Sequence, residues 1–110
     1  MLINDILDSR YRIWTLAETE KNAFSGCYAG DLLSVVLKSA KAGNLLVTII
    51  ANINTVAVAV LADLPAILFC EGAIPSAEMI QKAETEQIAL LSTELTSVEV
   101  ILDLARRSLL

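Results

Sequence analysis

The residue types best suited to bind a ligand form one short segment, Asn52-Ile53-Asn54-Thr55, which follows an almost unbroken apolar run over residues 45–50. Open α/β sheets bind their ligands just beyond the carboxyl ends of their strands. Two amides and a hydroxyl would be available there to a small polar molecule, together with the first N–H groups of a following helix. A simpler interpretation is that Asn54 or Thr55 caps that helix and binds nothing.

Groups that commonly carry out catalysis are scarce in the sequence. It contains no histidine, which is the commonest general base and the commonest metal ligand. Cys27 and Cys70 are too few for a zinc site or an iron–sulfur cluster within one chain, and free cysteines are usually small core residues. The four glycines cannot form a GxGxxG or GxxxxGK[ST] phosphate loop. Ser34 and Thr48 have no base partner that would make them nucleophiles. We therefore expect a protein that is not an enzyme and that has no cofactor and no metal.

The high content of hydrophobic residues, 55% of the chain, needs a physical explanation. Residues 45–70 are numerous enough to span a bilayer, which takes about 20 apolar residues. Asn52, Asn54, Asp63 and Pro65 interrupt this stretch, and an aspartate at mid-membrane costs roughly 2.5–3.5 kcal/mol. We expect no membrane segment. The surplus is assigned instead to a sheet buried on both faces and to a homodimer interface.

Charge and cysteine content restrict the partners and the compartment. The formal net charge of -5 argues against nucleic acid, whose phosphates attract clustered Lys and Arg. The one adjacent pair of cations, Arg106-Arg107, suits the end of a helix. No secretory signal is present in the first residues, and two cysteines fit a reducing compartment. We expect a cytoplasmic protein.

Short apolar runs bounded by Gly, Asn and Pro predict the elements around the polar segment. Residues 45–50 and 66–70 are expected to be strands of a parallel sheet, joined by a crossover that is usually helical. Residues 56–61 would form that helix, although their β-branched alternation also permits a hairpin with the preceding strand. Before the polar segment we also expect a short helix over 2–9, a strand over 11–16 and a loop over 18–25, in which residues 21–24 add to an edge strand. After it we expect a further strand over 88–91.

Three further helices are predicted from their caps and apolar stripes. The first is capped by Asp31, ends before Gly43 and has an apolar stripe of Leu33, Val36, Leu37 and Ala40. The second starts at Ser76 and turns inward Met79, Ile80 and Ala83. The third starts with a capping box between Thr96 and Glu99 and has a stripe of Val98, Ile101, Leu102, Ala105 and Leu109. The alternation of strands and helices predicts a single three-layer α/β/α domain over residues 1–110, with a mainly parallel sheet.

Several strings of residues are shared with a known family. Gly26-Cys27-Tyr28-Ala29-Gly30-Asp31-Leu32-Leu33-Ser34 resembles the Gly-x-Tyr-x-x-Asp-Leu-Leu-Ser signature of stand-alone DRTGG-domain proteins. Leu45-Leu46-Val47-Thr48-Ile49 and Asn54-Thr55-Val56-Ala57-Val58-Ala59 are similar to the strand and the segment that follow in the same proteins. Matching residues continue in the family's order to Val98-Glu99, so the resemblance covers nearly the whole chain.

The resemblance implies a fold related to the N-terminal domain of HPr kinase/phosphorylase and to a domain that precedes the catalytic part of some phosphotransacetylases. In those proteins the domain is regarded as regulatory or ligand-sensing. The label of serine kinase that some relatives carry does not transfer, because that chemistry belongs to a P-loop domain that this sequence lacks. The alternative is a structural or protein-interaction module, associated with a redox or hydrogenase system and without a ligand.

The resemblance and the polar segment together indicate a small polar ligand, such as a nucleotide or another phosphorylated molecule. The expected ligand-binding residues are Tyr28, Asp31, Ser34, Thr48, Asn52, Asn54 and Thr55. The chain departs from the family in Thr48-Ile49-Ile50-Ala51-Asn52-Ile53-Asn54, where relatives have an Asp-Arg-Thr-Gly-Gly-like segment or a Thr-x-x-x-His-x-Asn version. Asn52 replaces the histidine and no charge remains, so the ligand is expected to differ or to be absent.

Overall fold

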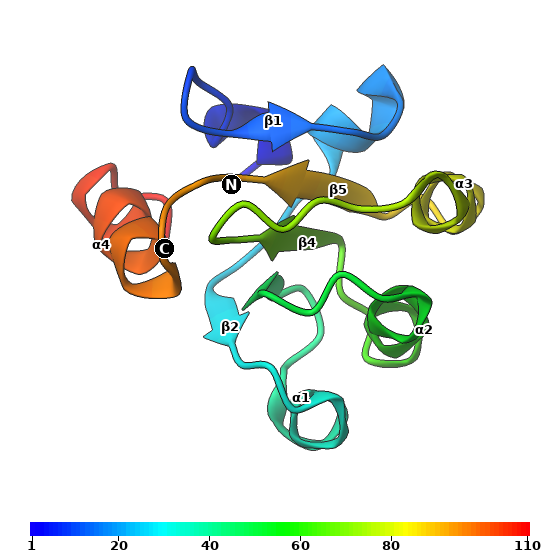
Figure 1. The fold of residues 1–110 in the computed structure, drawn as a ribbon. Coiled ribbons are helices and arrows are strands. Elements are labelled where there is room, and N and C mark those ends of the chain that lie inside the picture. The colour runs from blue at the N-terminus through cyan, green and yellow to red at the C-terminus, as the bar shows by residue number, and fades with distance from the viewer.

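A five-stranded sheet forms the middle layer of the protein. A computed structural model describes residues 1–110, and its parallel strands are β2 (Cys27–Ala29), β3 (Leu45–Thr48), β4 (Ala66–Phe69) and β5 (Ala89–Ser92). A two-residue strand, β1 (Arg12–Ile13), pairs antiparallel with β5. The order across the sheet is therefore β1-β5-β4-β3-β2, with the parallel strands in sequence order (Figure 1).

Strands β3, β4 and β5 are buried along their whole length. Successive side chains of a strand point to opposite faces, so each strand supplies two cores. Leu45 and Val47 of β3 join the core on one face, whereas Leu46 joins the core on the other. This arrangement explains the unbroken apolar runs in the sequence, since a strand covered on both faces has no solvent side to alternate with.

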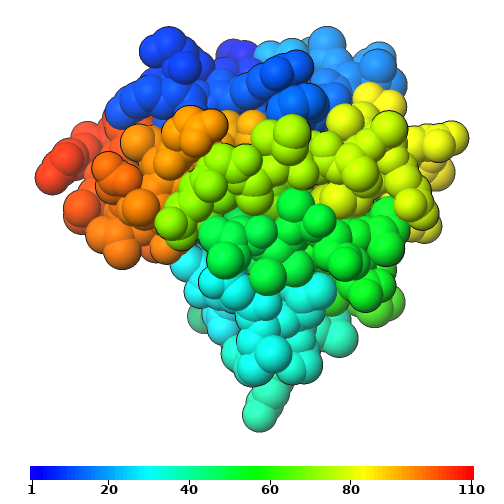
Figure 2. Space-filling model, in the orientation of Figure 1, coloured from blue at the N-terminus to red at the C-terminus, as the bar shows by residue number.

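The helices form the two outer layers (Figure 1). Three crossover helices, α1 (Leu33–Ser39), α2 (Ile53–Leu61) and α3 (Ala77–Thr85), pack on one face. On the other face lie α4 (Ser97–Arg106) and a 3₁₀ turn, η1 (Ile3–Asp5). The N-terminal residues, blue in Figure 2, lie along one end of the molecule and are next to the orange C-terminal part. The predicted three-layer α/β/α architecture with a mainly parallel sheet is confirmed.

Several local predictions are also confirmed. The ambiguous residues 56–61 belong to α2, because β3 and β4 run parallel and need a crossover rather than a hairpin turn. Ser76 caps α3 through its side chain, and the capping box between Thr96 and Glu99 begins α4. None of the helices is long and apolar enough to span a bilayer.

The predicted inward face of α4 is wrong for Val98 and Leu102, although Leu109, just beyond the helix, is buried as predicted. The helix buries Val100 and Leu104, while Val98 is 64% exposed and Leu102 is 46% exposed. Apolar residues occur on more than one side of this helix, so the pattern alone allowed two orientations. In this orientation the Asp103 carboxylate points back to the N-terminal segment and accepts a hydrogen bond from Tyr11 Oη at 2.7 Å.

The helix that follows Asp31 also differs from its prediction. It starts at Leu33 with Leu32 in the capping position, and no side chain caps it. Its C-cap is Ala40, so Gly43 lies in the turn beyond the helix rather than at its end. Of the predicted stripe only Val36 is fully buried, and Leu37 is 44% exposed. Seven residues are too short to bury a long stripe, and the Asp31 carboxylate is bound elsewhere.

The N-terminal segment is less regular than expected. The predicted helix over 2–9 is reduced to η1, and the strand over 11–16 is reduced to β1. The predicted loop over 18–25 contains a 3₁₀ helix, η2 (Ala17–Lys21), and its edge strand is a single bridge between Leu2 and Ala23. Side chains hold this segment in place of a regular ladder. Arg107 donates to the carbonyl oxygens of Asp5 at 2.7 Å and Ile6 at 3.3 Å.

Candidate functional site

The carboxyl edge of the parallel strands is the place where the fold gathers polar groups. After β4 the chain turns to α3 on one face, whereas after β5 it turns to α4 on the other. Adjacent strands whose connections leave toward opposite faces mark a topological switch point, where α/β sheets place their ligands. Here the two connections are tied together: Glu71 N donates to the Leu95 carbonyl at 2.9 Å, and Gly72 N to that of Thr93 at 3.0 Å.

The β4–α3 connection can make this close approach because of its backbone. Glu71 and Gly72 adopt consecutive left-handed conformations, with φ of 56° and 79°. A Cβ on Gly72 would lie 2.9 Å from Glu94 Oε2, so the glycine also leaves room for the neighbouring connection. The bonds between the two connections therefore close the centre of the crevice that would otherwise separate them, and one hollow remains on each side of this closure.

Two of the predicted site residues, Asp31 and Thr48, are brought into direct contact. Asp31 Oδ1 accepts hydrogen bonds from Thr48 Oγ1 and from Ile49 N, both at 2.9 Å. Thr48 Oγ1 in turn accepts a bond from Ile50 N at 3.2 Å. These bonds fix the loop after β3, and they explain why Asp31 does not cap α1.

The polar segment is largely engaged in starting α2. Asn52 is the capping residue, and its Oδ1 accepts a hydrogen bond from Asn54 N at 2.8 Å. The expectation that Asn54 or Thr55 would be the cap was therefore wrong by two or three positions. Thr55 is fully buried and donates from Oγ1 to the Ile50 carbonyl at 2.6 Å. The Asn54 side chain is exposed and makes no hydrogen bond within the chain.

Tyr28 and Ser34 lie apart from these bonds. Tyr28 is on β2, half-buried against the core under α1, α2 and α3. Ser34 is exposed in the first turn of α1. Neither side chain is hydrogen-bonded within the chain. The structure thus joins Asp31 with Thr48 and clusters Asn52, Asn54 and Thr55 at the start of α2, without uniting all seven residues in one cavity.

The first hollow, which we call the acidic hollow, lies on the β3 side of the closed crevice. It has a volume of about 140 Å³, and its lining includes Gly30, Asp31, Ile49, Cys70, Glu71 and Ser97. Burial raises the pKa of the Cys70 thiol, and the carboxylates of Glu71 and Asp31 raise it further. A thiol protonated in this way is a poor nucleophile and a poor metal ligand. The two carboxylates also oppose the binding of an anion here.

The second hollow, the arginine hollow, lies on the β1 side. It has a volume of about 300 Å³, and its lining includes Arg10, Arg12, Trp14, Gly72, Ser92 and Glu94. The guanidinium carbon of Arg12 lies 3.8 Å from the centre of the Trp14 ring. These residues were not among the predicted ones. The signal that would have found them is the i, i+2 spacing of Arg12 and Trp14 in a predicted strand, which puts both side chains on one face.

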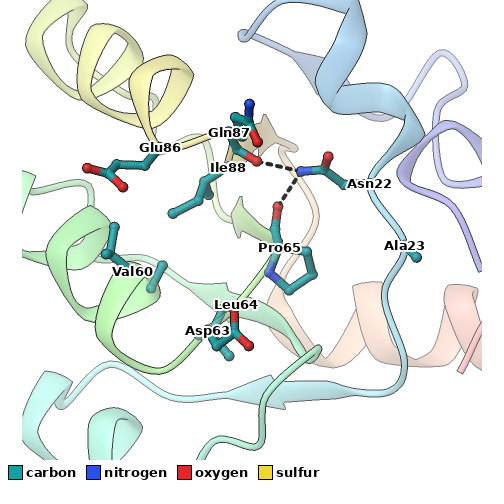
Figure 3. A pocket seen from close by; sticks show the side chains of 10 residues that line it. Asn22, Ala23, Val60, Asp63, Leu64, Pro65, Glu86, Gln87 and Ile88 are labelled. Atoms are coloured by element: carbon teal, nitrogen blue, oxygen red, sulfur yellow. Dashed lines mark hydrogen bonds between the residues drawn. The ribbon is translucent and has the colours of Figure 1, made fainter.

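A third hollow, of about 400 Å³, lies at the opposite, amino edge of the strands. Figure 3 shows Asn22 directing its amide toward Pro65 and Gln87, to whose carbonyl oxygens Nδ2 donates at 2.9 and 2.8 Å. Its two charged lining residues, Asp63 and Glu86, are both acidic. The Asn22 bonds link the N-terminal segment to the starts of β4 and β5, which is a structural role.

Comparisons with known proteins support the fold. No family model matches the sequence, and no curated protein matches it significantly. Among solved structures, the chain is similar to the CBS and DRTGG domains of the regulatory region of Clostridium perfringens pyrophosphatase, in complex with its activator, diadenosine tetraphosphate. The TM-score is 0.72 at 15% identity, over 89% of this chain and 43% of the other. This chain therefore shares its fold with part of that region.

Proposed function

We propose that this chain is a DRTGG-family regulatory domain that binds a small polar ligand at the carboxyl edge of its sheet and carries out no reaction itself. The observation that carries the proposal is the fold, which it shares at a TM-score of 0.72 with part of a regulatory region. That region is bound to a nucleotide activator in its crystal structure. We infer that residues 1–110 form one sensing unit and that its ligand is a nucleotide or another phosphorylated molecule.

The geometry of the edge supports a binding role better than a catalytic one. The carboxylate of Asp31 and the hydroxyl of Thr48, which could act as a base and a nucleophile, are hydrogen-bonded to each other and to the loop backbone. Asn54 and Ser34 have exposed side chains without a partner in the chain, so they are the members of the predicted set best able to contact a ligand. Loops from different strands meet at this edge, and a bound molecule would connect them.

Calorimetry and thermal unfolding test the proposal. The probes are inorganic pyrophosphate, AMP, ADP and diadenosine tetraphosphate, each at up to millimolar concentration, with glucose as an uncharged control. A ligand at about 100 times its dissociation constant stabilises the folded state by about 2.7 kcal/mol, which gives a clear shift in Tm. Binding of at least one phosphorylated probe, without conversion of that probe, is the expected result. The absence of binding by all of them would contradict a nucleotide-sensing role.

A second candidate function is a protein-interaction module, including a homodimer. The observation in its favour is the exposed apolar surface of the α1 region, where Leu32 is 66%, Val35 41% and Leu37 44% exposed. The neighbouring strand β2 has one partner and leaves its outer edge free. Light scattering on the wild type and on Leu37→Glu tests this candidate. A dimer that the variant converts to a monomer supports it, and a monomeric wild type removes the homodimer.

A further inference from the structure

We propose that the arginine hollow is the binding site for a phosphate-bearing small molecule, with the Arg12 guanidinium as the group that holds the phosphate. The inference rests on the proposed function, since it names a site and a ligand class for it. The hollow has a volume of about 300 Å³, which is the lower end of the range of about 300–1,000 Å³ for small-molecule sites. It lies directly beside the closed switch point, with Gly72, Thr93 and Glu94 on its wall.

Arg12 is held ready for an oxyanion by its neighbours. Arg12 on β1 lies opposite Ser92 on β5, and Trp14 follows two residues later on the same side. Trp14 Nε1 donates to Ser92 Oγ at 2.8 Å, which fixes the indole ring. The guanidinium carbon lies over that ring, 3.8 Å from its centre. Stacking occupies the face of the guanidinium and leaves its N–H groups at the edge, where they match a phosphate in bidentate geometry.

The charges around the hollow leave Arg12 unbalanced. Arg10 also lines it, but its guanidinium is paired with Asp8 at 2.6 Å and Asp103 at 2.8 Å. The Arg12 guanidinium forms no ion pair and no hydrogen bond in the chain. Glu94 is the one acidic residue in the lining, and its carboxylate lies next to Gly72. The hollow therefore offers one cation that is unpaired within the chain and lies over an indole ring that is itself hydrogen-bonded.

Neutral donors complete the site. Ser92 Oγ accepts the bond from Trp14, so its own hydroxyl proton is free for a ligand oxygen. Ser9 lies on the rim with an exposed hydroxyl. The two other hollows described above lack these features: the acidic hollow contains Asp31 and Glu71, and the hollow of Figure 3 has no cation in its lining. An anion would be repelled from both.

Trp14 gives the experiment a local probe, because it is the only tryptophan in the chain. Pyrophosphate and AMP are titrated into the full chain, and binding is followed in parallel by calorimetry and by tryptophan fluorescence. A ligand in the arginine hollow changes the Trp14 emission, whereas a ligand elsewhere gives heat without that change. The two readouts separate the site from the proposed function as a whole.

Four variants complete the test. Arg12→Gln is expected to raise the dissociation constant about tenfold to a hundredfold, which is the usual loss of affinity when one charge-assisted hydrogen bond is removed. Arg12→Lys keeps the charge but not the bidentate geometry and is expected to be intermediate. Arg106→Gln removes an exposed, unpaired arginine outside the hollow and is expected to bind normally. Asn54→Ala tests the competing location at the start of α2, where the Asn54 side chain is exposed and has no partner in the chain.

Each outcome decides one question. Loss of binding in Arg12→Gln alone, with a fluorescence change in the wild type, supports the site. Binding that is insensitive to Arg12, or lost instead in Asn54→Ala, overturns the site and leaves the proposed function intact. If the heat of binding is reduced equally in Arg12→Gln and Arg106→Gln, the probe is attracted by charge without a specific site, and the proposed site is overturned. No binding of either probe overturns both the site and the phosphorylated ligand.

Discussion

Replacement of Asp103 by alanine tests how the N-terminal segment is attached to the rest of the protein. Asp103 on α4 accepts hydrogen bonds from Tyr11 Oη at 2.7 Å, Arg10 Nη1 at 2.8 Å and Arg107 Nη1 at 3.1 Å. These partners come from both ends of the chain. We expect the variant to lose stability because Asp103 is the only acceptor of the Tyr11 hydroxyl. The two arginines keep other acceptors, Arg10 on Asp8 and Arg107 on backbone carbonyl oxygens.

The size of the loss follows from burial. Tyr11 is 4% exposed, and a buried donor left without its acceptor costs about 1–3 kcal/mol. The side chains of Asp103 and Arg107 are 14% and 27% exposed, and a partly exposed ion pair contributes about 0–1 kcal/mol. The Arg10 contact lies at the surface and is assigned no energy. With the middle of each range, Asp103→Ala is expected to reduce the free energy of unfolding by about 2–3 kcal/mol.

Urea unfolding followed by Trp14 fluorescence measures this change. With a slope of about 1–3 kcal/mol per molar urea, the midpoint should fall by roughly 0.7–3 M at an unchanged slope. Tyr11→Phe should cost about 1 kcal/mol, and the double variant should lose less than the sum of the two singles, since they remove the same bond. Glu84→Ala, a carboxylate without a partner in the chain, is the control and should change stability by less than about 0.5 kcal/mol. Strict additivity, or a loss no larger than in the control, would refute the reasoning.

Three further results are expected. Thr55→Val, which removes the buried donor to the Ile50 carbonyl, should cost about 1–3 kcal/mol in urea unfolding; a neutral effect would free Thr55 for a ligand role. Stability should fall in acid and not near neutral pH. Hydrogen bonds from Arg10 lower the pKa of Asp8; burial opposes ionisation of Asp103, but the bonds from Tyr11, Arg107 and Arg10 together lower its pKa. Because both pKa values are lower in the folded chain, the unfolded chain binds more protons in acid. The stability contributed by the two ionised carboxylates is complete above the ordinary aspartate pKa of 3.8 and is lost as the pH falls through the lowered values. Asp103→Asn should reduce this loss of stability in acid, measured by unfolding at a series of pH values. Iodoacetamide should label half-buried Cys27 before Cys70, which is 1% exposed; mass spectrometry of the native protein checks the order, and equal labelling would contradict the burial of Cys70.

The sequence was sufficient for features that depend on neighbouring residues. A capping box needs only Thr96 and Glu99, three positions apart, and it begins α4 as expected. The apolar runs at β3 and β4 indicated strands buried on both faces, and the parallel arrangement then required α2 to be a helix. Each of these conclusions follows from local pattern and chain connectivity.

The features that the sequence did not reveal depend on contacts between distant residues. Tyr11 and Asp103 are separated by 92 positions, and with Asp103 bonded to Tyr11 the neighbouring Leu102 is exposed to solvent. Asp31 is 17 positions from Thr48, and that bond removes it from the cap of α1. Arg12 and Trp14 could be located on one strand face, but their proximity to the β5 carboxyl edge required the antiparallel pairing of β1 with β5.

The closed switch point restricts the sides from which a ligand can approach the carboxyl edge of the sheet. In open α/β sheets the crevice between diverging connections provides the space for a ligand. Here the bonds of Glu71 and Gly72 to the β5–α4 connection fill that space with backbone. A ligand must therefore approach from one side of the closure. The β3 side is narrow and lined by Asp31 and Glu71, whereas the β1 side is twice as large, at about 300 against 140 Å³, and contains an unpaired guanidinium. Volume and charge favour the same side for a phosphorylated molecule, so the short antiparallel strand at the edge of the sheet has a role in binding that its two residues alone would not suggest.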